Sequence, residues 1–331
     1  MSKILVTGGC GFIGSHFVDL ALSKKNQVIN IDKHTYAAVR KNLKKENYTE
    51  IICDISKYKE VYKIINKLKP NYIINFAAES HVDNSIIDPN KSFKTNIIGT
   101  LNLVNCIRNL KLKCKFIQVS TDEVFGSLKL NDKSKFNQNS KYNPKSPYSA
   151  SKASADHIVS SFSNTYSLNC VITYCTNNFG PRQHQEKFIP MILNKLFKKQ
   201  KVNIYGNGKN VRDWIYVKDH CKILYKIMKN KKIKDRKFYI STNNEYSNLE
   251  LTYLIIKRIY NRLPKTESYK KIQFVADRPS HDLRYSIDNK KIKKIFNFKS
   301  TDFFKAIDIT INYYKKNLKK TKYFNYNKIK L

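Results

Sequence analysis

The sequence predicts an α/β fold, in which a doubly wound parallel sheet is followed by a smaller α+β lobe. Through the first half of the 331 residues, short apolar runs alternate with longer segments whose apolar residues recur at helical spacing. Strands that alternate with helices in this way are typical of a parallel sheet with helices on both faces. After about Gly180 the alternation becomes irregular. We therefore expect a regular sheet domain first and a smaller, mixed lobe after it.

The elements of the first half follow from these runs. Pro70 comes just after the lysine-rich end of one helical segment and is a typical helix stop. Residues 129–145 lack a clear period and predict a loop. The predicted strands are residues 4–7, 28–31, 50–53, 72–76, 115–120 and 169–174. The helices predicted between them are residues 15–24, 57–68, 89–110 and 146–166.

The second half predicts mainly helices. A chain of this length usually exceeds one core. We expect one domain at residues 1–179 and a smaller lobe at residues 180–331, and we allow for the exchange of a strand between them. The lysine-rich tail after Asn317 is expected to be loosely ordered. The predicted helices are residues 190–199, 217–229, 248–262 and 301–317.

The glycines of the first domain predict its ligand. Four of the nine glycines (Gly8, Gly9, Gly11 and Gly14) fall within seven residues directly after the first predicted strand. The Gly-x-x-Gly-x-x-Gly pattern gives a tight turn, close approach of the backbone to a pyrophosphate and a helix start that faces the phosphates. Asp32, at the end of the second strand, would bond the adenosine ribose hydroxyls and disfavour a 2′-phosphate. The sequence thus predicts a Rossmann-type site for NAD rather than NADP.

Tyr148 and Lys152 are four residues apart, so they lie on one face of the predicted helix. A tyrosine, with a pKa near 10, is a poor base at neutral pH. A lysine ammonium and a nicotinamide cation nearby would favour the phenolate, and lowering the pKa by about three units corresponds to about 4 kcal/mol. A Tyr-x-x-x-Lys spacing also occurs on solvated helices. Its position after a strand that ends at Thr121 favours a catalytic pair.

Together these features resemble the extended short-chain dehydrogenase/reductases that act on nucleotide sugars, the epimerase and dehydratase group. Within it the sequence is most similar to the nucleoside-diphosphate-glucose 4,6-dehydratases, and the likeness runs almost end to end. The motifs that carry it are residues 32–37 (DKHTYA), 77–83 (AAESHVD), 120–126 (STDEVFG), 148–157 (YSASKASADH), 177–182 (NNFGPR), 212–217 (RDWIYV) and 277–282 (DRPSHD).

The resemblance implies a lyase that converts dTDP-glucose to dTDP-4-keto-6-deoxyglucose and water by internal hydride transfer through bound NAD, on a route to rhamnose-like sugars. UDP-glucose is an alternative substrate, because thymine and uracil differ by one methyl group, worth only about 1–3 kcal/mol in an apolar pocket. A nucleotide-sugar 4-epimerase or a UDP-glucuronate decarboxylase would share the fold, NAD and the Tyr/Lys pair. A non-catalytic NAD sensor or scaffold would have no reason to hold the Tyr/Lys pair together with the carboxyls of Asp122 and Glu123.

Asp122 and Glu123 follow the strand end directly. Eliminating water from a 4-keto sugar requires a base at C5 and an acid at the C6 hydroxyl, hence two carboxyls in different protonation states. By resemblance, Glu123 removes the C5 proton and Asp122 protonates the leaving hydroxyl, while Thr121 bonds the 4-hydroxyl beside Tyr148. Adjacent residues of an extended chain point to opposite sides. Both carboxyls reach the sugar only if the chain bends after Thr121. An epimerase would not need this pair, and a decarboxylase would not need the acid.

The resemblance also assigns binding residues, and no metal is expected. Arg212 and Arg278 carry guanidinium forks that match diphosphate oxygens. The residues assigned to the cofactor are Gly8, Gly11, Phe12, Ile13, Gly14, Asp32, Lys33, Asp54, Ile55, Ala77, Ala78, Asn96, Tyr148 and Lys152. Those assigned to the nucleotide sugar are Ser80, His81, Asn178, Lys187, Arg212, Asn248, Arg278 and His281.

The formal charge of +38 at first suggests a nucleic-acid partner. However, the 63 basic residues include only nine arginines, and the lysines are spread along the whole chain. Proteins that read bases or bind a phosphate through two parallel hydrogen bonds favour the planar fork of arginine, which lysine cannot copy. Asn, Ile and Tyr, which share A/T-rich codons with Lys, are also abundant. Genome composition is therefore the plainer explanation, and we expect no nucleic-acid partner.

The sequence also predicts the cellular compartment and the oligomeric state. The seven cysteines are an odd number without a Cys-x-x-Cys pair, which favours free thiols in a reducing cytoplasm. No run of 18 apolar residues appears, and Met1 leads directly into a strand-like run, so neither a membrane span nor a signal peptide is expected. Members of the resembled family form homodimers through a four-helix bundle. Residues 89–110 and 146–166 correspond to its two helices per subunit.

Overall fold

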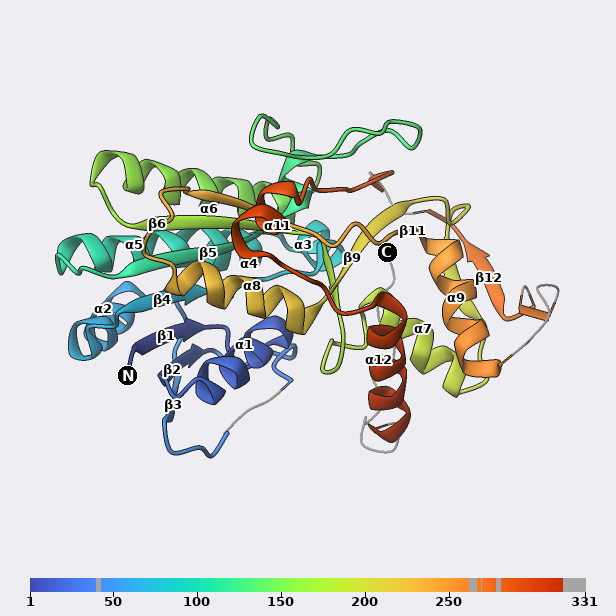
Figure 1. The fold of residues 1–331 in the computed structure, drawn as a ribbon, viewed down its shortest axis with the longest axis horizontal. Coiled ribbons are helices and arrows are strands. Elements are labelled where there is room, and N and C mark those ends of the chain that lie inside the picture. The colour runs from blue at the N-terminus through green and yellow to red at the C-terminus, as the bar shows by residue number, and fades with distance from the viewer. Residues whose placement is uncertain (40–42, 262–266, 269, 278–280, 318–331) are drawn as a thin grey trace.

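A parallel seven-stranded sheet runs through the larger lobe of the computed structural model, which describes all residues except 40–42, 262–266, 269, 278–280 and 318–331 (Figure 1). The strand order is β10-β6-β5-β4-β1-β2-β3, and all neighbouring pairs are parallel. The order reverses between β1 and β4, and ligands of such sheets bind beyond the carboxyl ends of the strands at this point. The strands are β1 (Lys3–Thr7), β2 (Gln27–Asp32), β3 (Tyr48–Ile52), β4 (Tyr72–Asn75), β5 (Lys115–Thr121), β6 (Cys170–Cys175) and β10 (Lys237–Ile240).

Helices cover both faces of this sheet, which confirms the predicted fold class. Side chains alternate along β1, so that Ile4 and Val6 enter one buried cluster and Leu5 the other. The first cluster includes α1 (Phe12–Ser23) and α8 (Val217–Lys229), which pack side by side. The second cluster includes α2 (Tyr58–Leu68), α5 (Gly99–Asn109) and α6 (Pro147–Thr165). The central strands are thus buried on both sides, as their continuous apolar sequences require, whereas the edge strand β3 is partly exposed.

The predicted elements of the first half are all present, with two corrections. The helix predicted at residues 89–110 is broken into α4 (Pro89–Phe93), a π-helical turn (Lys94–Ile98) and α5. The extra residue of a π-turn redirects side chains and is frequent at functional sites. The short helix α3 (Val82–Ile87), which the sequence pattern did not indicate, precedes this break.

The second correction concerns the sheet itself. Its seventh strand, β10, comes from the second half of the chain and pairs in parallel with β6. Helix α11 (Lys290–Phe296) packs on β10. The second half therefore contributes α8, β10 and α11 to the larger lobe. A boundary at residue 180 therefore does not coincide with the boundary between the two lobes, because β10 and α11 belong to the larger lobe.

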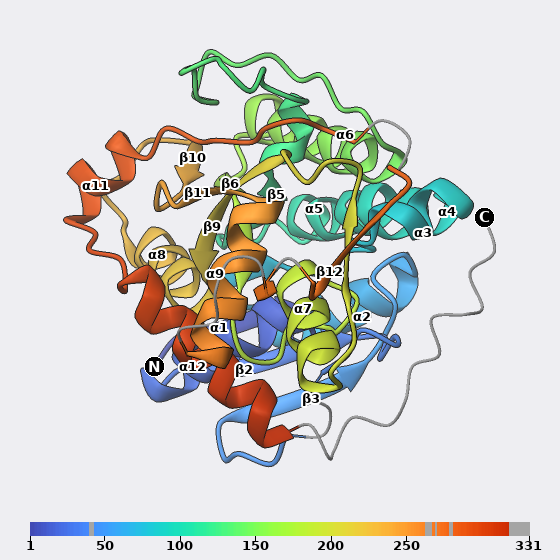
Figure 2. The same ribbon diagram turned by 90° about the vertical axis from the view of Figure 1, so that its right-hand side faces the viewer.

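The smaller lobe lies at the carboxyl end of the sheet (Figures 1 and 2). It contains a three-stranded sheet in the order β11-β9-β7 and a two-stranded sheet of β12 and β8. Helix α12 packs against α7 and α9. Its strands are β7 (Asn177–Phe179), β8 (Val202–Tyr205), β9 (Val211–Tyr216), β11 (Glu245–Ser247) and β12 (Ile272–Val275), and its helices are α7 (Phe188–Phe197), α9 (Asn248–Tyr260) and α12 (Phe303–Asn317).

The four helices predicted in the second half correspond to α7, α8, α9 and α12, whereas the strands β8 to β12 and helix α11, within the described residues, were not predicted. The prediction for the tail after Asn317 lies outside the described residues. The predicted loop at residues 129–145 touches the second half through an isolated bridge between Phe136 and Ile287. Among the described residues, no helix combines the length and the apolar character that a membrane crossing requires.

Candidate active site

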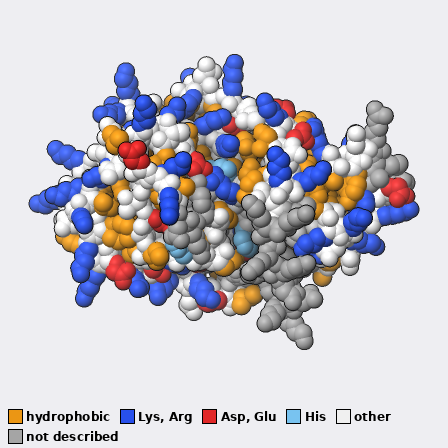
Figure 3. Space-filling model, turned by 90° about the horizontal axis from the view of Figure 1, so that it is seen from below, with side chains coloured by type: hydrophobic (Ala, Val, Ile, Leu, Met, Phe, Trp, Pro, Cys, Tyr) orange, Lys and Arg blue, Asp and Glu red, His pale blue; other side chains and the backbone are white. Residues whose placement is uncertain are grey.

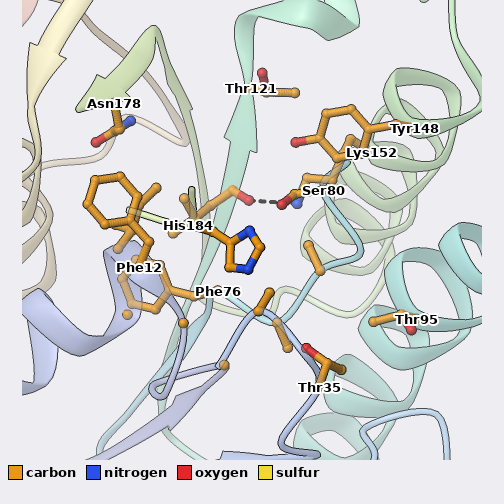
Figure 4. A pocket seen from close by; sticks show the side chains of 18 of the residues that line it. Phe12, Thr35, Phe76, Ser80, Thr95, Thr121, Tyr148, Lys152, Asn178 and His184 are labelled. Carbon is orange, nitrogen blue, oxygen red and sulfur yellow. Dashed lines mark hydrogen bonds between the residues drawn. The ribbon is translucent and has the colours of Figure 1, made fainter. Parts of the chain in front are cut away.

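A cleft opens beyond the carboxyl ends of β1, β2, β4, β5 and β6, between the sheet and residues 175–187 (Figure 4). Tyr148 and Lys152 lie on one side of the view, with Asn178 across from them. The residues that line the cleft are Gly8, Gly11, Phe12, Ile13, Gly14, Ile31, Asp32, Lys33, Thr35, Ala37, Ala38, Cys53, Asp54, Ile55, Phe76, Ala77, Ala78, Ser80, Thr95, Val119, Ser120, Thr121, Asp122, Glu123, Tyr148, Lys152, Cys175, Thr176, Asn177, Asn178, Gln183, His184, Glu186 and Lys187.

The glycine turn forms a cradle that side chains would fill. A Cβ on Gly8, whose φ is +72°, would lie 2.6 Å from the backbone nitrogen of Ala77. A Cβ on Gly14 would lie 2.3 Å from the carbonyl oxygen of Gly8. Helix α1 starts at Phe12, and its N-cap Gly11 offers no side chain to cap the first turn. The helix start and the bare backbone at this edge of the cleft therefore fit a pyrophosphate.

Asp32 lies at the end of β2 with 8% of its surface exposed. One carboxylate oxygen accepts the backbone N–H of Cys10 at 2.9 Å, and the other accepts that of His34 at 2.8 Å. These bonds hold the carboxylate in place at the edge of the cleft. Each oxygen keeps lone pairs with which it can accept ribose hydroxyls. The neighbouring Lys33 instead forms an ion pair with Glu79 at 2.7 Å.

Asn96 is the exception among the residues assigned to the cofactor. All the others line the cleft, whereas Asn96 is buried behind it in the π-helical turn. Its side chain accepts the backbone N–H of Glu79 at 3.0 Å and donates to the Glu79 carbonyl and to the Ser151 hydroxyl. Asn96 thus holds the loop that follows β4 against α6.

Tyr148 and Lys152 come from the first turns of α6, which begins with a capping box formed by Ser146 and Ser149. The Lys152 ammonium donates to the Val119 carbonyl at 2.7 Å. Burial lowers the pKa of Lys152. Burial and the charge of Glu123 raise the pKa of Tyr148 well above its ordinary value. A positive charge brought into the cleft would oppose this shift and favour the phenolate.

The chain bends where the two carboxyls require it. β5 ends at Thr121, and residues Asp122–Phe125 form a 3₁₀ turn. The Thr121 hydroxyl accepts the backbone N–H of Glu123 at 3.3 Å, which caps the turn. Asp122 and Glu123 consequently both line the cleft, although an extended chain would have pointed them apart.

The two carboxyls have different surroundings. Asp122 is 2% exposed, and its Oδ2 has no hydrogen-bond partner among the described residues. Burial, Glu123 and Asp213 raise the pKa of Asp122 well above its usual range, against the opposing effects of Arg212 and the Thr121 hydroxyl. Glu123 is only partly buried. These surroundings favour the protonated form of Asp122, which suits an acid beside a second carboxyl.

Three of the residues assigned to the nucleotide sugar line the cleft, namely Ser80, Asn178 and Lys187. The Lys187 ammonium donates to the Ser80 carbonyl at 2.9 Å, which joins the start of α7 to the loop after β4. The side-chain oxygen of Asn178 is 2.9 Å from Nδ1 of His220.

Arg212, on β9, does not line the cleft. Its guanidinium donates to the carbonyls of Val211 at 2.8 Å and Asp282 at 2.9 Å, and it lies over the ring of Tyr285. Its charge nevertheless acts on Asp122. Arg212 therefore binds the backbone at Asp282 and also opposes the rise in the pKa of Asp122.

The other predicted sugar residues also lie beyond the cleft lining. His81 caps α3 and accepts the backbone N–H of Asn84. Asn248 opens α9, and His281 is bonded to Asp277 at 2.6 Å. Arg278 lies outside the described residues.

Sequence reasoning missed part of the cleft wall that forms after Pro181. Gln183, His184 and Glu186 all line the cleft, and His184 Nδ1 lies 3.3 Å from Glu186. The polar run between Pro181 and the next apolar segment was the available signal. Thr35, Phe76, Ser120 and Cys175 were likewise not assigned. Phe76, Ser120 and Cys175 stand at or next to the carboxyl end of a strand, and Thr35 lies in the loop that follows β2, so only the assembled sheet brings them together.

Surface charge gathers in no single patch on the face shown in Figure 3, where lysine and arginine side chains are scattered among other residues. This distribution agrees with the even spread of lysine along the sequence.

Known proteins show the same arrangement over nearly the whole chain. A family model described as GDP-mannose 4,6 dehydratase matches residues 5–309. dTDP-glucose 4,6-dehydratase 1 of Escherichia coli (strain K12) is 38% identical over 339 residues, covering 96% of this chain and 94% of its own length. dTDP-glucose 4,6-dehydratase of Xanthomonas campestris pv. campestris (strain B100) is 36% identical, covering 95% and 93%.

Solved structures agree with these relatives. A dTDP-glucose 4,6-dehydratase from Bacillus anthracis str. Ames in complex with NAD has a TM-score of 0.85 at 34% identity, covering 96% of this chain and 98% of its own. The dTDP-glucose 4,6-dehydratase DesIV from Streptomyces venezuelae with NAD and TYD bound has a TM-score of 0.87 at 33% identity, covering 95% and 97%. A UDP-glucose 4-epimerase from Thermus thermophilus, at 23% identity, shares the fold with a TM-score of 0.84, covering 95% and 99%.

Proposed function

Since the chain belongs to the GDP-mannose 4,6-dehydratase family, we propose that it converts dTDP-glucose to dTDP-4-keto-6-deoxyglucose and water. Curated relatives that match nearly the whole chain act on this nucleotide sugar, as their names state. The observation that carries the proposal within this chain is the carboxyl pair Asp122 and Glu123, which lines the cleft beside Tyr148. A 4-epimerase needs no such pair.

NAD is the cofactor, and the residues of the first lobe fit it. The cradle at Gly8 and Gly14 has no room for side chains, and the start of α1 suits a diphosphate. Asp32 suits the adenosine ribose. When bound, NAD supplies a hydride acceptor for C4 of the sugar and a hydride donor for C6. It leaves the cycle in its starting oxidation state, so it can stay bound through many turnovers.

The reaction uses the chain's own residues in four proton transfers. Tyr148 takes the proton of the 4-hydroxyl while C4 is oxidised, and Thr121 holds that oxygen. The ketone acidifies the C5 proton, which Glu123 removes, and Asp122 gives its proton to the C6 hydroxyl, which leaves as water. When C6 then takes up the hydride, Glu123 returns its proton to C5, and Tyr148 and Asp122 regain their starting states by proton exchange with solvent. The raised pKa of Asp122 favours the protonated form that the loss of water requires.

Binding of the nucleotide sugar requires both lobes. We assign residues 1–179 to NAD and residues 180–331 mainly to the nucleotide sugar, with β10 returned to the first lobe. Ser80, Asn178 and Lys187 reach the sugar from the cleft wall. Arg212 is assigned to the diphosphate, with Asn248 and His281 beyond it.

The substrate assignment is tested by incubating the purified protein with dTDP-glucose and, separately, with UDP-glucose. We expect the alkali-induced absorbance of a 4-keto-6-deoxy product, with a higher kcat/KM for dTDP-glucose. A higher value for UDP-glucose would reassign the base while keeping the reaction. Absence of product from both would refute the dehydratase proposal.

The chain is further proposed to act as a homodimer in the cytoplasm. Phe93 and Ile98 lie in residues 89–110, the first of the two segments predicted to form the four-helix bundle. Their side chains are 39% and 44% exposed, which suits burial against a second copy. All seven cysteines are free thiols, which suits a reducing compartment. The molar mass in solution tests the dimer, and a monomer at micromolar concentration would contradict it.

A further inference from the structure

A cysteine, a histidine and a glutamate meet beside Asp32, outside the catalytic carboxyls. Cys10 lies in the turn after β1, His34 follows β2, and Glu50 is in β3. Their ligand atoms all lie within 4.8 Å of one another, and they are the one such group of three within the described part of the chain. Cys10 is 1% exposed, and the side chains of His34 and Glu50 are 14% and 9% exposed. Three segments that are distant in sequence thus direct three metal-binding atoms to one point.

The distances suit a small cation. Zinc bonds of about 2.0 Å to nitrogen or oxygen and about 2.3 Å to sulfur place tetrahedral ligand atoms roughly 3.3–3.6 Å apart. Cys10 Sγ lies 3.4 Å from Glu50 Oε2, within this range. His34 Nε2 lies 2.7 Å from Glu50 Oε1, so this pair must separate slightly and exchange its hydrogen bond for two metal bonds. A small shift of the imidazole therefore completes the geometry.

Surrounding groups orient these ligands. The Tyr48 hydroxyl donates to Glu50 Oε2 at 2.6 Å, and the side-chain amide of Asn30 lies 3.2 Å from Cys10 Sγ. Asp32 accepts the backbone N–H groups of both Cys10 and His34. His34 has a φ of +54°, a conformation that non-glycine residues rarely adopt. Such outer bonds are what fixes the ligands of a metal centre.

We propose that Cys10, His34 and Glu50 bind one divalent cation of the zinc class, with water as the fourth ligand. One sulfur, one nitrogen and one oxygen suit zinc, whereas magnesium and calcium prefer oxygen ligands alone. The thiol must lose its proton to bind, so each bound cation releases about one proton. Burial, Asp32 and Glu50 raise the pKa of Cys10, and zinc must overcome this preference. Affinity consequently falls as pH falls.

The site is coupled to the cofactor cleft through Asp32. A cation that holds Cys10 and His34 also fixes both N–H donors of the Asp32 carboxylate. We expect zinc to raise NAD affinity several-fold and NAD to raise zinc affinity by the same factor. This coupling rests on the proposed NAD function, whereas cation binding itself does not.

Cobalt(II) titration of the metal-stripped full-length protein tests the site. A thiolate ligand gives cobalt a near-ultraviolet charge-transfer band, which zinc removes by displacement. We expect one cobalt per chain in the wild type, loss of the band in Cys10→Ser and at least tenfold weaker binding in His34→Gln. Cys106→Ser, which removes a buried thiol of α5, should bind as the wild type does.

The outcomes separate the possibilities. Absence of the band in the wild type, or a band that survives Cys10→Ser, overturns the proposal. If Cys10→Ser fails to give a cooperative thermal transition, His34→Gln decides, because its side chain is partly exposed and its loss leaves the turn intact. NAD titration with and without zinc then tests the coupling. An unchanged NAD affinity at saturating zinc refutes the coupling even where cobalt binds.

Discussion

The two lobes differ in how well their sequence motifs predict which residues line the cleft. In the first lobe, the glycine turn, Asp32 and the pair Tyr148 and Lys152 are local patterns, and the structure brings them to one cleft. In the second half, Arg212 and His281 belong to equally recognisable motifs, yet they are bonded to backbone or to Asp277 rather than lining that cleft. A local turn or helix start fixes where a ligand group lies. A residue on a small lobe is placed by long-range packing, which its motif does not describe.

The largest expected effect comes from Gly14→Ala. Its Cβ would meet the Gly8 carbonyl at 2.3 Å, so α1 must move away from the turn. We expect NAD affinity to fall about a hundredfold or more and the free energy of unfolding to fall by about 1–3 kcal/mol. NAD titration and urea unfolding measure the two effects. Gly208→Ala is the matched control in the smaller lobe, since it combines a φ of +69° with a Cβ 2.7 Å from Ile204. It should lose stability without losing NAD affinity, and equal loss of NAD affinity in both variants would contradict the local account.

Asp122→Asn should lower product formation by about 10²–10³-fold, because the amide cannot supply the proton for the departing hydroxyl. In the wild type the raised pKa of Asp122 favours its acid form, so activity should fall as the pH rises through that pKa. The variant should lack this alkaline limb in its kcat/KM profile. The exposed Asp132→Asn is the control and should match the wild type. A preserved alkaline limb in Asp122→Asn would assign it to another group.

Asp156→Asn tests a buried carboxyl that the reaction does not use. Asp156 is fully buried on α6, accepts the Ser120 hydroxyl at 2.5 Å and has its pKa raised by burial to about 7. A folded-state pKa above the unfolded value near 3.9 gives stability that is present at low pH and lost as pH rises through about 7. We expect wild-type unfolding free energy to fall by about 3 kcal/mol more than that of Asp156→Asn between pH 5 and pH 8. Parallel urea-unfolding curves for the two proteins at both pH values would refute this.

Arg212→Lys has a smaller expected effect, and it distinguishes a role of Arg212 in substrate binding from a structural role in the second lobe. Lysine keeps the charge but loses the planar fork. If the guanidinium serves the diphosphate, KM for the nucleotide sugar should rise about tenfold while NAD affinity stays unchanged. Steady-state kinetics and NAD titration decide this. An unchanged KM together with lower stability would leave Arg212 as a brace for the carbonyls of Val211 and Asp282.

Much of the first lobe was predictable because its signals are periodic and local. The apolar runs gave the six strands, and the spacing of Gly8, Gly11 and Gly14 gave the turn. The placement of β10 was not predictable, because its four residues carry no period and their parallel pairing with β6 spans more than sixty positions of the chain.

The site shows the same division. The need for a bend after Thr121 could be stated from the sequence, but the 3₁₀ turn that supplies it is visible only in the structure. The break in the helix predicted at 89–110 carried no proline or glycine signal at Thr95 and Asn96. Packing against the loop that holds Glu79 accompanies that break. The wall formed by Gln183, His184 and Glu186 likewise depends on how the chain returns to the sheet.

Glu123 and Asp122 are proposed to turn a hydride-transfer site into a dehydratase, and the variant Glu123→Gln tests this proposal. The variant is mixed with dTDP-glucose in a single turnover, and both the absorbance of NADH and the 4-keto-6-deoxy product are followed. We predict that NADH forms and persists while product formation falls at least a hundredfold, because C4 is oxidised but the C5 proton stays in place. Product formation at the wild-type rate would contradict the account.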